Sequence, residues 1–504
     1  MRFAHLVHFQ TNGSIMRMRF EQQLIIGQLL IEDTEIKSKS KNALDQLFAA
    51  LKSIYCNKEY NDEIFCILEK HITSNKKRTG RKGMNLWTIF VFAQVRLCLN
   101  TSYDVLHNLA NNHVSLRQIA GVEMDSGFKR IEFDYQNIYD NVSMLSNELI
   151  TEINAVILKF GHSEVFKKKE ETALRLKTDS FVVESNVHFP TDYNLLWDSA
   201  RKCLDTVSHF LKRHNTVEGW RKLTNWRYEL KGLMRELGKA SSSGGKGKQD
   251  RVTNAARRYL RKAKSLLKKL NHALSDFPHQ EQEDFLLIVV LEHFIILMDK
   301  HIDLVERRIL KNEIIPHAEK MFSIFETYTQ WVKKGKMRPN VELGKKLSIT
   351  TDQFDLIVDY ELMDDNQQDR DVVIELADRL LLKYNISSWS FDKGYWRKEN
   401  KELLQLEIPN VIMPKLGKRN KAEEAEETSH AFKRLKNKHS AIESNINELE
   451  NRGLDRCPDR GIHHYKRYIG FGVCAYNLKK IGKQILKMEL GANGKDKIEL
   501  QEAA

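Results

Sequence analysis

A strand-like segment that is separated from every later strand by a long helical region is the strongest constraint on the fold. Residues 173–183 alternate with period two, which predicts a β-strand. Apolar residues then recur at helical spacing from Tyr193 to about Phe325. Strand patterns return at 341–350 and 354–363, which flank a short polar turn and predict a hairpin. The first strand must therefore find its partners beyond the helical region.

Helices and strands alternate after this hairpin. We expect a helix from about 370 to 384, a strand at 386–391, a helix starting near Trp396, a strand at 411–413 and a long helix at 429–451. With the helical region set aside, the order is strand, strand, strand, helix, strand, helix, strand, helix. This order predicts a mixed α/β sheet interrupted by an all-helical insertion.

The length of 504 residues exceeds what one hydrophobic core serves, and we expect several domains. Helical spacing from Asn42 to about Phe160 predicts a helical N-terminal domain. A run rich in Gly, Ser and Lys at 238–249 cannot bury apolar surface, which predicts a flexible loop. The expected divisions are an N-terminal extension (1–20), a helical, candidate DNA-binding domain (21–165), a catalytic core (166–195 and 326–490), a helical insertion (196–325) and a polar tail (491–504).

The charge balance favours an anionic partner. Lys and Arg number 81 against 68 Asp and Glu, a net charge of +13, which favours nucleic acid or an acidic membrane surface. The six cysteines contain no C-x-x-C pair, so neither a zinc ribbon nor a disulfide framework is indicated and a reducing cytoplasm fits best. No stretch reads as a membrane span. We therefore expect a cytoplasmic, nucleoid-associated protein that binds DNA.

Two basic segments are candidates for DNA contact. One includes Arg78, Arg81 and Lys82 and precedes an apolar helix predicted at 86–99. Two short helices predicted after it, near 103–110 and 115–119, resemble a helix-turn-helix, although any two short helices in a bundle look similar. The other is a predicted helix at 251–270, whose eight like charges repel unless a polyanion compensates them. A solvated helix face is the alternative. The candidate DNA-binding residues are Arg78, Arg81, Lys82, Arg257, Arg258, Arg261, Lys262, Lys268 and Lys269.

Three carboxylates stand at informative places in the predicted order. Asp179 lies on the first strand, Asp392 follows the strand at 386–391, and Glu443 lies on the last long helix. Each alone is most simply a solvated charge. Together, separated by 392 − 179 = 213 and 443 − 392 = 51 residues, they meet only if the strand ends and the helix converge. Because clustered like charges are costly unless cations neutralise them, the pattern predicts a magnesium site for phosphoryl transfer.

A resemblance to a known family is carried by five segments in this order. They are GRKGMNLWTIFVFAQVRLCLNTSYDVLHNLA (80–110), LKTDSFVVESNVHFPTDYNLL (176–196), FDKGYWRKEN (391–400), VIMPKLGK (411–418) and HSAIESNINELENRGLDR (439–456). The last four resemble the surroundings of the catalytic Asp, Asp and Glu of bacterial insertion-sequence DDE transposases, similar to the ISNCY-type and related families. The first looks like the helical N-terminal region of those enzymes.

The resemblance implies an RNase H-like catalytic core in which Asp179, Asp392 and Glu443 bind two Mg²⁺ ions, with Mn²⁺ as a substitute. It also implies magnesium-dependent strand cleavage at terminal inverted repeats and strand transfer into target DNA, by a homodimer or higher assembly on DNA. Some related families carry Arg four residues before the glutamate and Lys seven after it. This chain has His439 and Glu450 there, so the strand contacts of those families are not transferred.

Two other functions stay open at this point. The chain is alternatively an RNase H-like nuclease that does not join strands, or an inactive transposon-derived DNA-binding protein. Several other polar residues have simpler interpretations. His439 either faces DNA or is a partly buried structural histidine, Glu184 and Asp192 support a turn, and Cys457, His463 and His464 lack zinc-ligand spacing.

Overall fold

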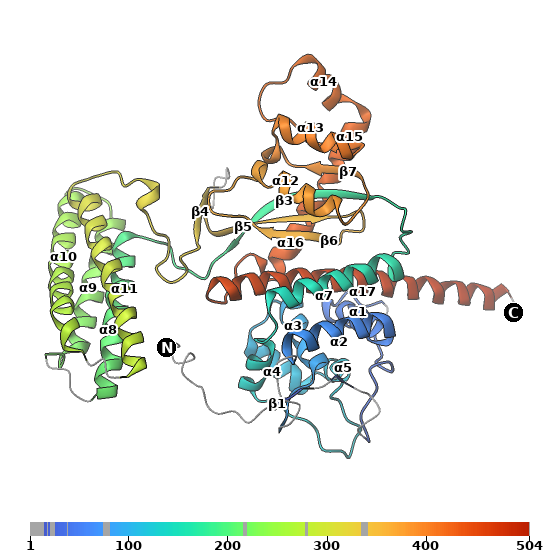
Figure 1. Cartoon of the computed structure of the whole chain (residues 1–504), viewed down its shortest axis with the longest axis horizontal. Helices are drawn as coiled ribbons and strands as arrows, with labels where there is room; N and C mark the ends of the chain where they lie inside the picture. The colour runs from blue at the N-terminus through green and yellow to red at the C-terminus, as the bar shows by residue number, and fades with distance from the viewer. Residues whose placement is uncertain are drawn as a thin grey trace. The chain divides into compact units, whose positions relative to one another are not determined.

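The computed structural model describes residues 15–17, 19–20, 26–37, 39–73, 81–214, 219–277, 281–333 and 341–502 (Figure 1). Side chains are described for these residues except 15, 16, 81 and 492–502. The chain divides into two compact units. One comprises the residues up to Asn186 together with those from Val332 onward, and the other comprises Val187–Trp331.

A mixed sheet forms the centre of the first unit. Strand β3 (Leu174–Glu184) pairs in antiparallel fashion with β5 (Val341–Thr351) and in parallel with β7 (Ile386–Phe391). The sheet order is β4 (Gln330–Lys333), β5, β3, β7 and β8 (Asn410–Ile412), and β6 (Ile357–Leu362) also pairs with β5. The hairpin expected at 341–363 is therefore present. This mixed α/β arrangement is compatible with an RNase H-like DDE core.

The buried face of β3 is held by side-chain hydrogen bonds as well as by the ladder. The Thr178 hydroxyl lies 2.7 Å from that of Thr350, and Trp389 Nε1 donates to Thr178 Oγ1 at 2.7 Å. At the other end of the pairing, a Cβ atom on Gly344 would lie only 1.9 Å from the Val183 carbonyl oxygen. Glycine is therefore required for β5 to approach β3 this closely.

Helices follow the strands of the sheet, with one correction to the prediction. The expected long helix at 429–451 is broken at Ser440, whose hydroxyl donates to the Asn437 carbonyl oxygen at 2.7 Å and so competes with regular helix hydrogen bonding. The helices of this part are α12 (Val373–Leu381), α13 (Lys398–Glu407), α14 (Lys421–Thr428), α15 (His430–His439) and α16 (Ala441–Leu449). Glu443 consequently lies in the first turn of a short helix.

The N-terminal helices belong to the same compact unit as the sheet. They pack with the long C-terminal helix α17 (Ile462–Glu502), and Asn477 on that helix bonds both Asn154 and the Ile357 carbonyl oxygen at 3.0 Å. The N-terminal helices are α1 (Ala43–Cys56), α2 (Lys58–Ile72), α3 (Leu86–Cys98), α4 (Tyr103–Asn112), α5 (Val114–Ile119), α6 (Tyr135–Val142) and α7 (Asn147–Phe160).

The described parts of both predicted terminal segments contain regular structure. Within the proposed extension 1–20, β1 (Ile15–Met16) pairs with β2 (Arg81–Lys82), and Arg19 Nε lies 2.7 Å from a Glu69 carboxylate oxygen. Helix α17 continues through the proposed polar tail to Glu502. The described parts of both segments are therefore integrated into regular structure.

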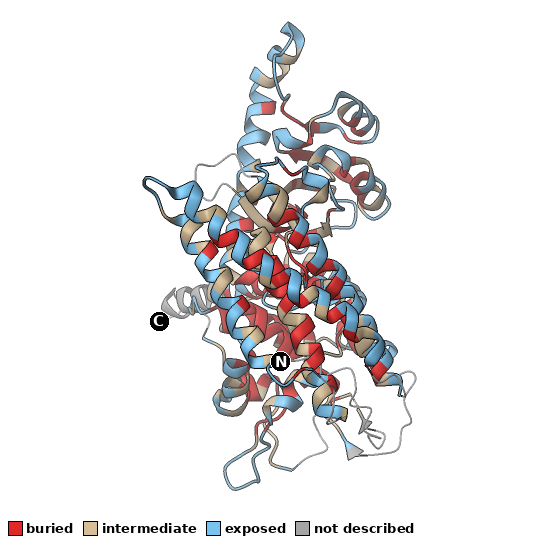
Figure 2. Cartoon of the chain, turned by 90° about the vertical axis from the view of Figure 1, so that its left-hand side faces the viewer, coloured by how far each residue is buried: buried red, intermediate tan, exposed pale blue. Residues whose placement is uncertain are grey.

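The second unit is a helical bundle with its own apolar core. Its helices are α8 (Asp192–His214), α9 (Leu223–Ser242), α10 (Lys248–Ala273) and α11 (Gln282–Val305). Buried residues such as Leu204, Tyr259 and Met298 form the core, and Figure 2 shows buried and exposed residues alternating along these helices. The loop expected at 238–249 is shorter than predicted, because α9 extends to Ser242 and α10 begins at Lys248. None of the described helices is long and apolar enough to span a bilayer.

Candidate active site

Asp179 lies on β3, and Asp392 directly follows the neighbouring parallel strand β7. Thr178 on β3 is opposite Phe391 on β7, so Asp179 and Asp392 are the next residues in the same register. Neighbouring strands are about 4.8 Å apart in a sheet. The pairing of β3 with β7 therefore brings together two acids that are far apart in the sequence.

The pKa of Asp179 responds to the charge of Glu443 as well as to that of Asp392. Burial raises the pKa of Asp179 to about 7, against the lowering effect of the Ser180 N–H, which donates to Asp179 Oδ1 at 2.7 Å. The charges of Asp392, Asp369 and Glu443 raise this pKa further. Asp392 and Glu443 thus both act electrostatically on Asp179, and Asp369 is a further acid that the sequence did not single out.

The donor set suits a hard divalent cation, whereas the side chains do not form a closed coordination shell. Among the described residues, no group of three His, Cys, Asp or Glu side chains is arranged to hold a metal ion. Asp392 and Glu443 are exposed and Asp179 is half-buried, so side-chain reorientation can shorten their separations. Repulsion among carboxylates opposes closer approach until a cation is bound. The oxygen-only chemistry of the group fits Mg²⁺ or Mn²⁺.

Helix α16 is fastened to the sheet and to α17 by buried apolar residues and by ion pairs. Ile442 and Leu449 are buried on its inner face. On the polar side, the Glu448 carboxylate pairs with Lys479 and lies 3.1 Å from Lys480 Nζ on α17. These contacts fix the helix that bears Glu443.

Asp369 is held by two strands of the sheet. Its carboxylate accepts hydrogen bonds from Ser180 Oγ at 2.6 Å and from Lys346 Nζ at 2.7 Å. Asp369 lies in the polar run DDNQQDRD (364–371), where no periodicity distinguishes one acid from the others. Only the tertiary contacts identify it as part of the site.

Part of the chain is similar to a known protein family. The family model of the transposase DDE domain matches residues 315–478. This segment is similar to a transposase DDE domain. The match confirms the resemblance to insertion-sequence DDE transposases. It includes Asp392 and Glu443, whereas Asp179 lies on the strand that precedes the matched segment. No curated protein and no solved structure matches the chain.

His439 packs against a strand of the DDE domain. Its Nδ1 atom lies 3.0 Å from Ser390 Oγ on β7. Burial lowers the pKa of His439 to about 4, although the charge of Asp392 opposes this effect. The imidazole is therefore neutral near pH 7 and offers no positive charge to a phosphate, which favours the structural interpretation.

Other singled-out residues make structural contacts around the DDE domain. The backbone of Glu184 bridges to Arg456, and Asp192 lies 2.8 Å from Arg308 Nη1 within the helical bundle. Cys457 is buried and His464 Nδ1 lies 2.9 Å from the Arg460 carbonyl oxygen. Within the described residues, none of these side chains belongs to a group of three that could hold a metal ion.

The N-terminal DNA-binding candidates are only partly described. Arg78 and the side chain of Arg81 lie outside the described residues, and Lys82 is exposed on β2. In the helix pair α4–α5, the second helix is six residues long, and its only cation, Arg117, is buried and pairs with Glu123 at 2.7 Å. A recognition helix needs exposed base-contacting side chains, so α5 does not have the character expected of one.

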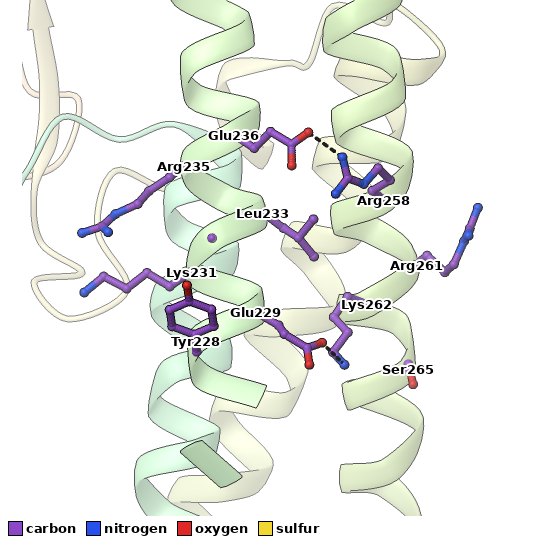
Figure 3. Close-up of a pocket in the computed structure, with 11 residues that line it drawn as sticks. Tyr228, Glu229, Lys231, Leu233, Arg235, Glu236, Arg258, Arg261, Lys262 and Ser265 are labelled. Atoms are coloured by element: carbon purple, nitrogen blue, oxygen red, sulfur yellow. Dashed lines mark hydrogen bonds and ion pairs between the residues drawn. The ribbon is translucent and has the colours of Figure 1, made fainter. Parts of the chain in front are cut away.

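Helices α9 and α10 of the insertion flank an open groove of about 800 Å³ (Figure 3). Two ion pairs cross it: Arg258 Nη1 lies 2.6 Å from Glu236, and Lys262 pairs with Glu229. Lys269 donates to the Gly219 carbonyl oxygen at 2.9 Å. Arg258 and Lys262 therefore have carboxylate partners within the bundle, whereas Lys269 has an uncharged acceptor there.

The remaining candidate cations of α10 form a separate row. Arg257, Arg261 and Lys268 are exposed and have no partner among the described residues. Their spacing of four and then seven residues places them on one side of the helix. Lys231 and Arg235 on α9 are likewise unpaired within the described part of the chain, and Figure 3 shows them pointing away from α10. The free positive charge thus lies on the outer sides of the groove.

Proposed function

We propose that the chain is a DDE transposase, of the ISNCY-type or a related family, that cleaves DNA strands at the terminal inverted repeats of its element and transfers them into target DNA. The observation that carries this proposal is the pairing of β3 with β7, which puts Asp179 beside the residue after Phe391, together with the effect of the Asp392 and Glu443 charges on Asp179. The transposase DDE domain at residues 315–478 supports it. The arrangement of the strands is compatible with the RNase H-like core that this chemistry uses.

The chemistry needs positioned charge more than it needs a covalent nucleophile. In-line attack on a phosphodiester depends on alignment and on neutralisation of charge at phosphorus. When bound, two divalent cations supply activation of the attacking oxygen and neutralisation at phosphorus. The residues that would hold them are Asp179 on β3, Asp392 directly after β7 and Glu443 on α16. The half-buried setting of Asp179 keeps that part of the site partly shielded from water.

DNA contact is proposed for two basic regions of the protein. In the insertion, the unpaired Arg257, Arg261 and Lys268 are favoured over the intramolecularly paired Arg258, Lys262 and Lys269. At the N-terminus, Arg78, Arg81 and Lys82 stay candidates. Assembly as a homodimer or higher oligomer on DNA accompanies this proposal, since two element ends have to be held together.

The proposal is tested with the full chain, Mg²⁺ and a labelled duplex that carries a terminal inverted repeat. Asp179→Asn, Asp392→Asn and Glu443→Gln should each lower the cleavage rate about a thousandfold, roughly 4 kcal/mol of transition-state stabilisation. Asp371→Asn is the matched control, because Asp371 pairs with Arg397 at 2.9 Å and should leave cleavage near the wild-type rate. Unchanged cleavage in any of the three acid variants would contradict the assignment of that acid.

The same reaction separates the alternative functions. A transposase should join a labelled 3′-hydroxyl end to a target plasmid, and this product should disappear with the three acid variants. Cleavage without joined product would identify a nuclease. Specific binding of the repeat with neither cleavage nor joining would identify a DNA-binding protein.

A further inference from the structure

Asp369 occupies a bridge between three chain segments that are remote in the sequence. It lies in a single helical turn (Asp369–Asp371), whereas Ser180 belongs to β3 and Lys346 belongs to β5. Both contacts are short, at 2.6 and 2.7 Å, and the side chains of Asp369 and Lys346 are only 19% and 23% exposed. The bridge is therefore largely protected from solvent.

This bridge touches the neighbours of two candidate catalytic acids. Ser180 follows Asp179, and its backbone N–H donates to Asp179 Oδ1 at 2.7 Å. On the other side, a Cβ atom on Gly394, two residues after Asp392, would lie 3.1 Å from Asp369 Oδ2. The carboxylate of Asp369 is thus packed against the backbone that follows Asp392 while it binds the residue that follows Asp179.

A buried hydroxyl lies at the same place. Tyr395 is only 1% exposed, and burial and the neighbouring charge of Asp369 raise its pKa well above the ordinary value. Ser348 and Ser180 lie beside this tyrosine. Asp369 thus accepts from one hydroxyl and one ammonium group, which fix the geometry of its carboxylate, and its charge also acts on the buried Tyr395.

We propose that Asp369 is a positioning residue that sets the separation of Asp179 and Asp392 for binding a divalent cation, through Ser180 on one side and the backbone at Gly394 on the other. The inference rests on the proposed function. Because Lys346 balances the charge of Asp369, the role is geometric, and Asp369 is not itself a ligand. Residues that orient metal ligands typically change metal affinity 10- to 100-fold when they are removed.

The test is Mn²⁺ binding to the full chain without DNA, measured by titration calorimetry beside a thermal melt of each variant. Asp369→Ala and Ser180→Ala should each weaken Mn²⁺ binding about tenfold or more. Ser180→Thr keeps the hydroxyl group and should bind within about twofold of wild type. Asp371→Ala is the matched control, since it disturbs the same turn without touching β3 or β5, and its Mn²⁺ affinity should be unchanged.

Lys346→Met separates a geometric role from a purely electrostatic one. If Asp369 positions the acids, loss of its partner should weaken Mn²⁺ binding. If Asp369 acted only through its charge, Lys346→Met would strengthen binding, because the negative charge would be left uncompensated, and that result would overturn the proposal.

A further pair of results distinguishes failure of this inference from failure of the proposed function. Mn²⁺ binding that is lost in Asp179→Asn but unchanged in Asp369→Ala and Ser180→Ala would refute the positioning role alone. No Mn²⁺ binding by the wild type, or binding unaffected by Asp179→Asn, would remove the metal site and the inference with it. A melting temperature lowered in Asp369→Ala with normal Mn²⁺ affinity would assign the bridge to stability only.

Discussion

Lys177 Nζ lies 2.9 Å from Asp355 Oδ1. Lys177 is on β3, two residues before Asp179, and Asp355 is in the turn between β5 and β6, so this ion pair joins the strand to the turn. Asn445 on α16 donates to the same oxygen at 3.4 Å, two residues after Glu443. The Lys177 side chain is only 12% exposed. One polar bridge therefore connects the strand that carries Asp179 with the helix that carries Glu443.

Asp355→Asn should destabilise the fold although its shape is nearly unchanged. Asp355 has φ of +62°, a conformation that Asn tolerates, so the substitution tests the charge alone. It leaves the nearly buried Lys177 ammonium without its counter-charge, which should lower the unfolding free energy by about 1–3 kcal/mol in urea denaturation. Lys177→Met removes the ammonium group that requires a counter-charge, so it should lower the unfolding free energy less than Asp355→Asn does. Equal stability of Asp355→Asn and wild type would contradict this account.

Neutralising the unpaired cations of α10 should weaken DNA binding in a salt-dependent manner. The triple change of Arg257, Arg261 and Lys268 to Gln should reduce the slope of log affinity against log salt by roughly 2 to 3 units, since each phosphate contact contributes about 0.9. The matched control is Arg258→Gln with Glu236→Gln, which removes a paired charge and its partner. Fluorescence anisotropy over a salt series in EDTA measures both. Equal slopes for wild type and the triple variant would exclude this row as a DNA contact.

The attachment of α16 to α17 should depend on pH through Glu448. Burial alone would raise the pKa of Glu448, but Lys479 and Lys480 lower it below its ordinary value. A carboxyl group whose pKa is lowered by folding stabilises the fold above its unfolded pKa, and that contribution is lost as the pH falls through the folded value. The stability difference between wild type and Glu448→Gln should thus be present at pH 7 and shrink below about pH 4. Chemical denaturation of both proteins at pH 7 and below pH 4 measures this stability difference. A difference that persists in acid would contradict the role given to the Glu448 charge.

Asp459→Ala should be among the most destabilising single changes in the first unit. Arg96 on α3 is buried, its guanidinium group lies 4.3 Å from the centre of the Tyr103 ring, and Nη2 lies 2.8 Å from Asp459 Oδ1. Loss of the partner leaves a buried charge, which typically costs about 3–5 kcal/mol. Thermal unfolding measures the loss. Arg96→Met combined with Asp459→Ala should recover part of the stability, and no recovery would show that Asp459 acts in another way.

Much of the sheet was predictable because strand alternation depends only on local residues. The strand at 386–391 was placed at its observed bounds, and 173–183 differs from β3 by one residue at each end. Since Asp392 follows such a strand directly, its position at the end of β7 was accessible from the sequence. The bridge formed by Asp369 was not, because its partners on β3 and β5 are defined only by tertiary packing.

Charge partners between helices were also beyond prediction. The cations of α10 appeared uncompensated because Glu229 and Glu236 belong to another helix, and the register between two antiparallel helices cannot be derived from either one. Likewise, the packing of α17 against the N-terminal helices could not be derived from the sequence of either part. The close crossing of α1 and α17, where a Cβ atom on Gly482 would lie 1.6 Å from the Gln46 carbonyl oxygen, accounts for the single unit observed.

The aromatic rings of Phe189 and Trp331, near the two ends of the helical bundle, lie 5.6 Å apart. If the chain between Val187 and Trp331 were an unstructured loop, closing it would impose an entropic cost on the pairing of β3 with β5. If the bundle folds first, the contact between Phe189 and Trp331 has already brought the two ends of its chain together. The strands β3 and β5 can then pair as if only a short connection separated them. The order of assembly would then run from the bundle to the sheet, and the acids would come together last.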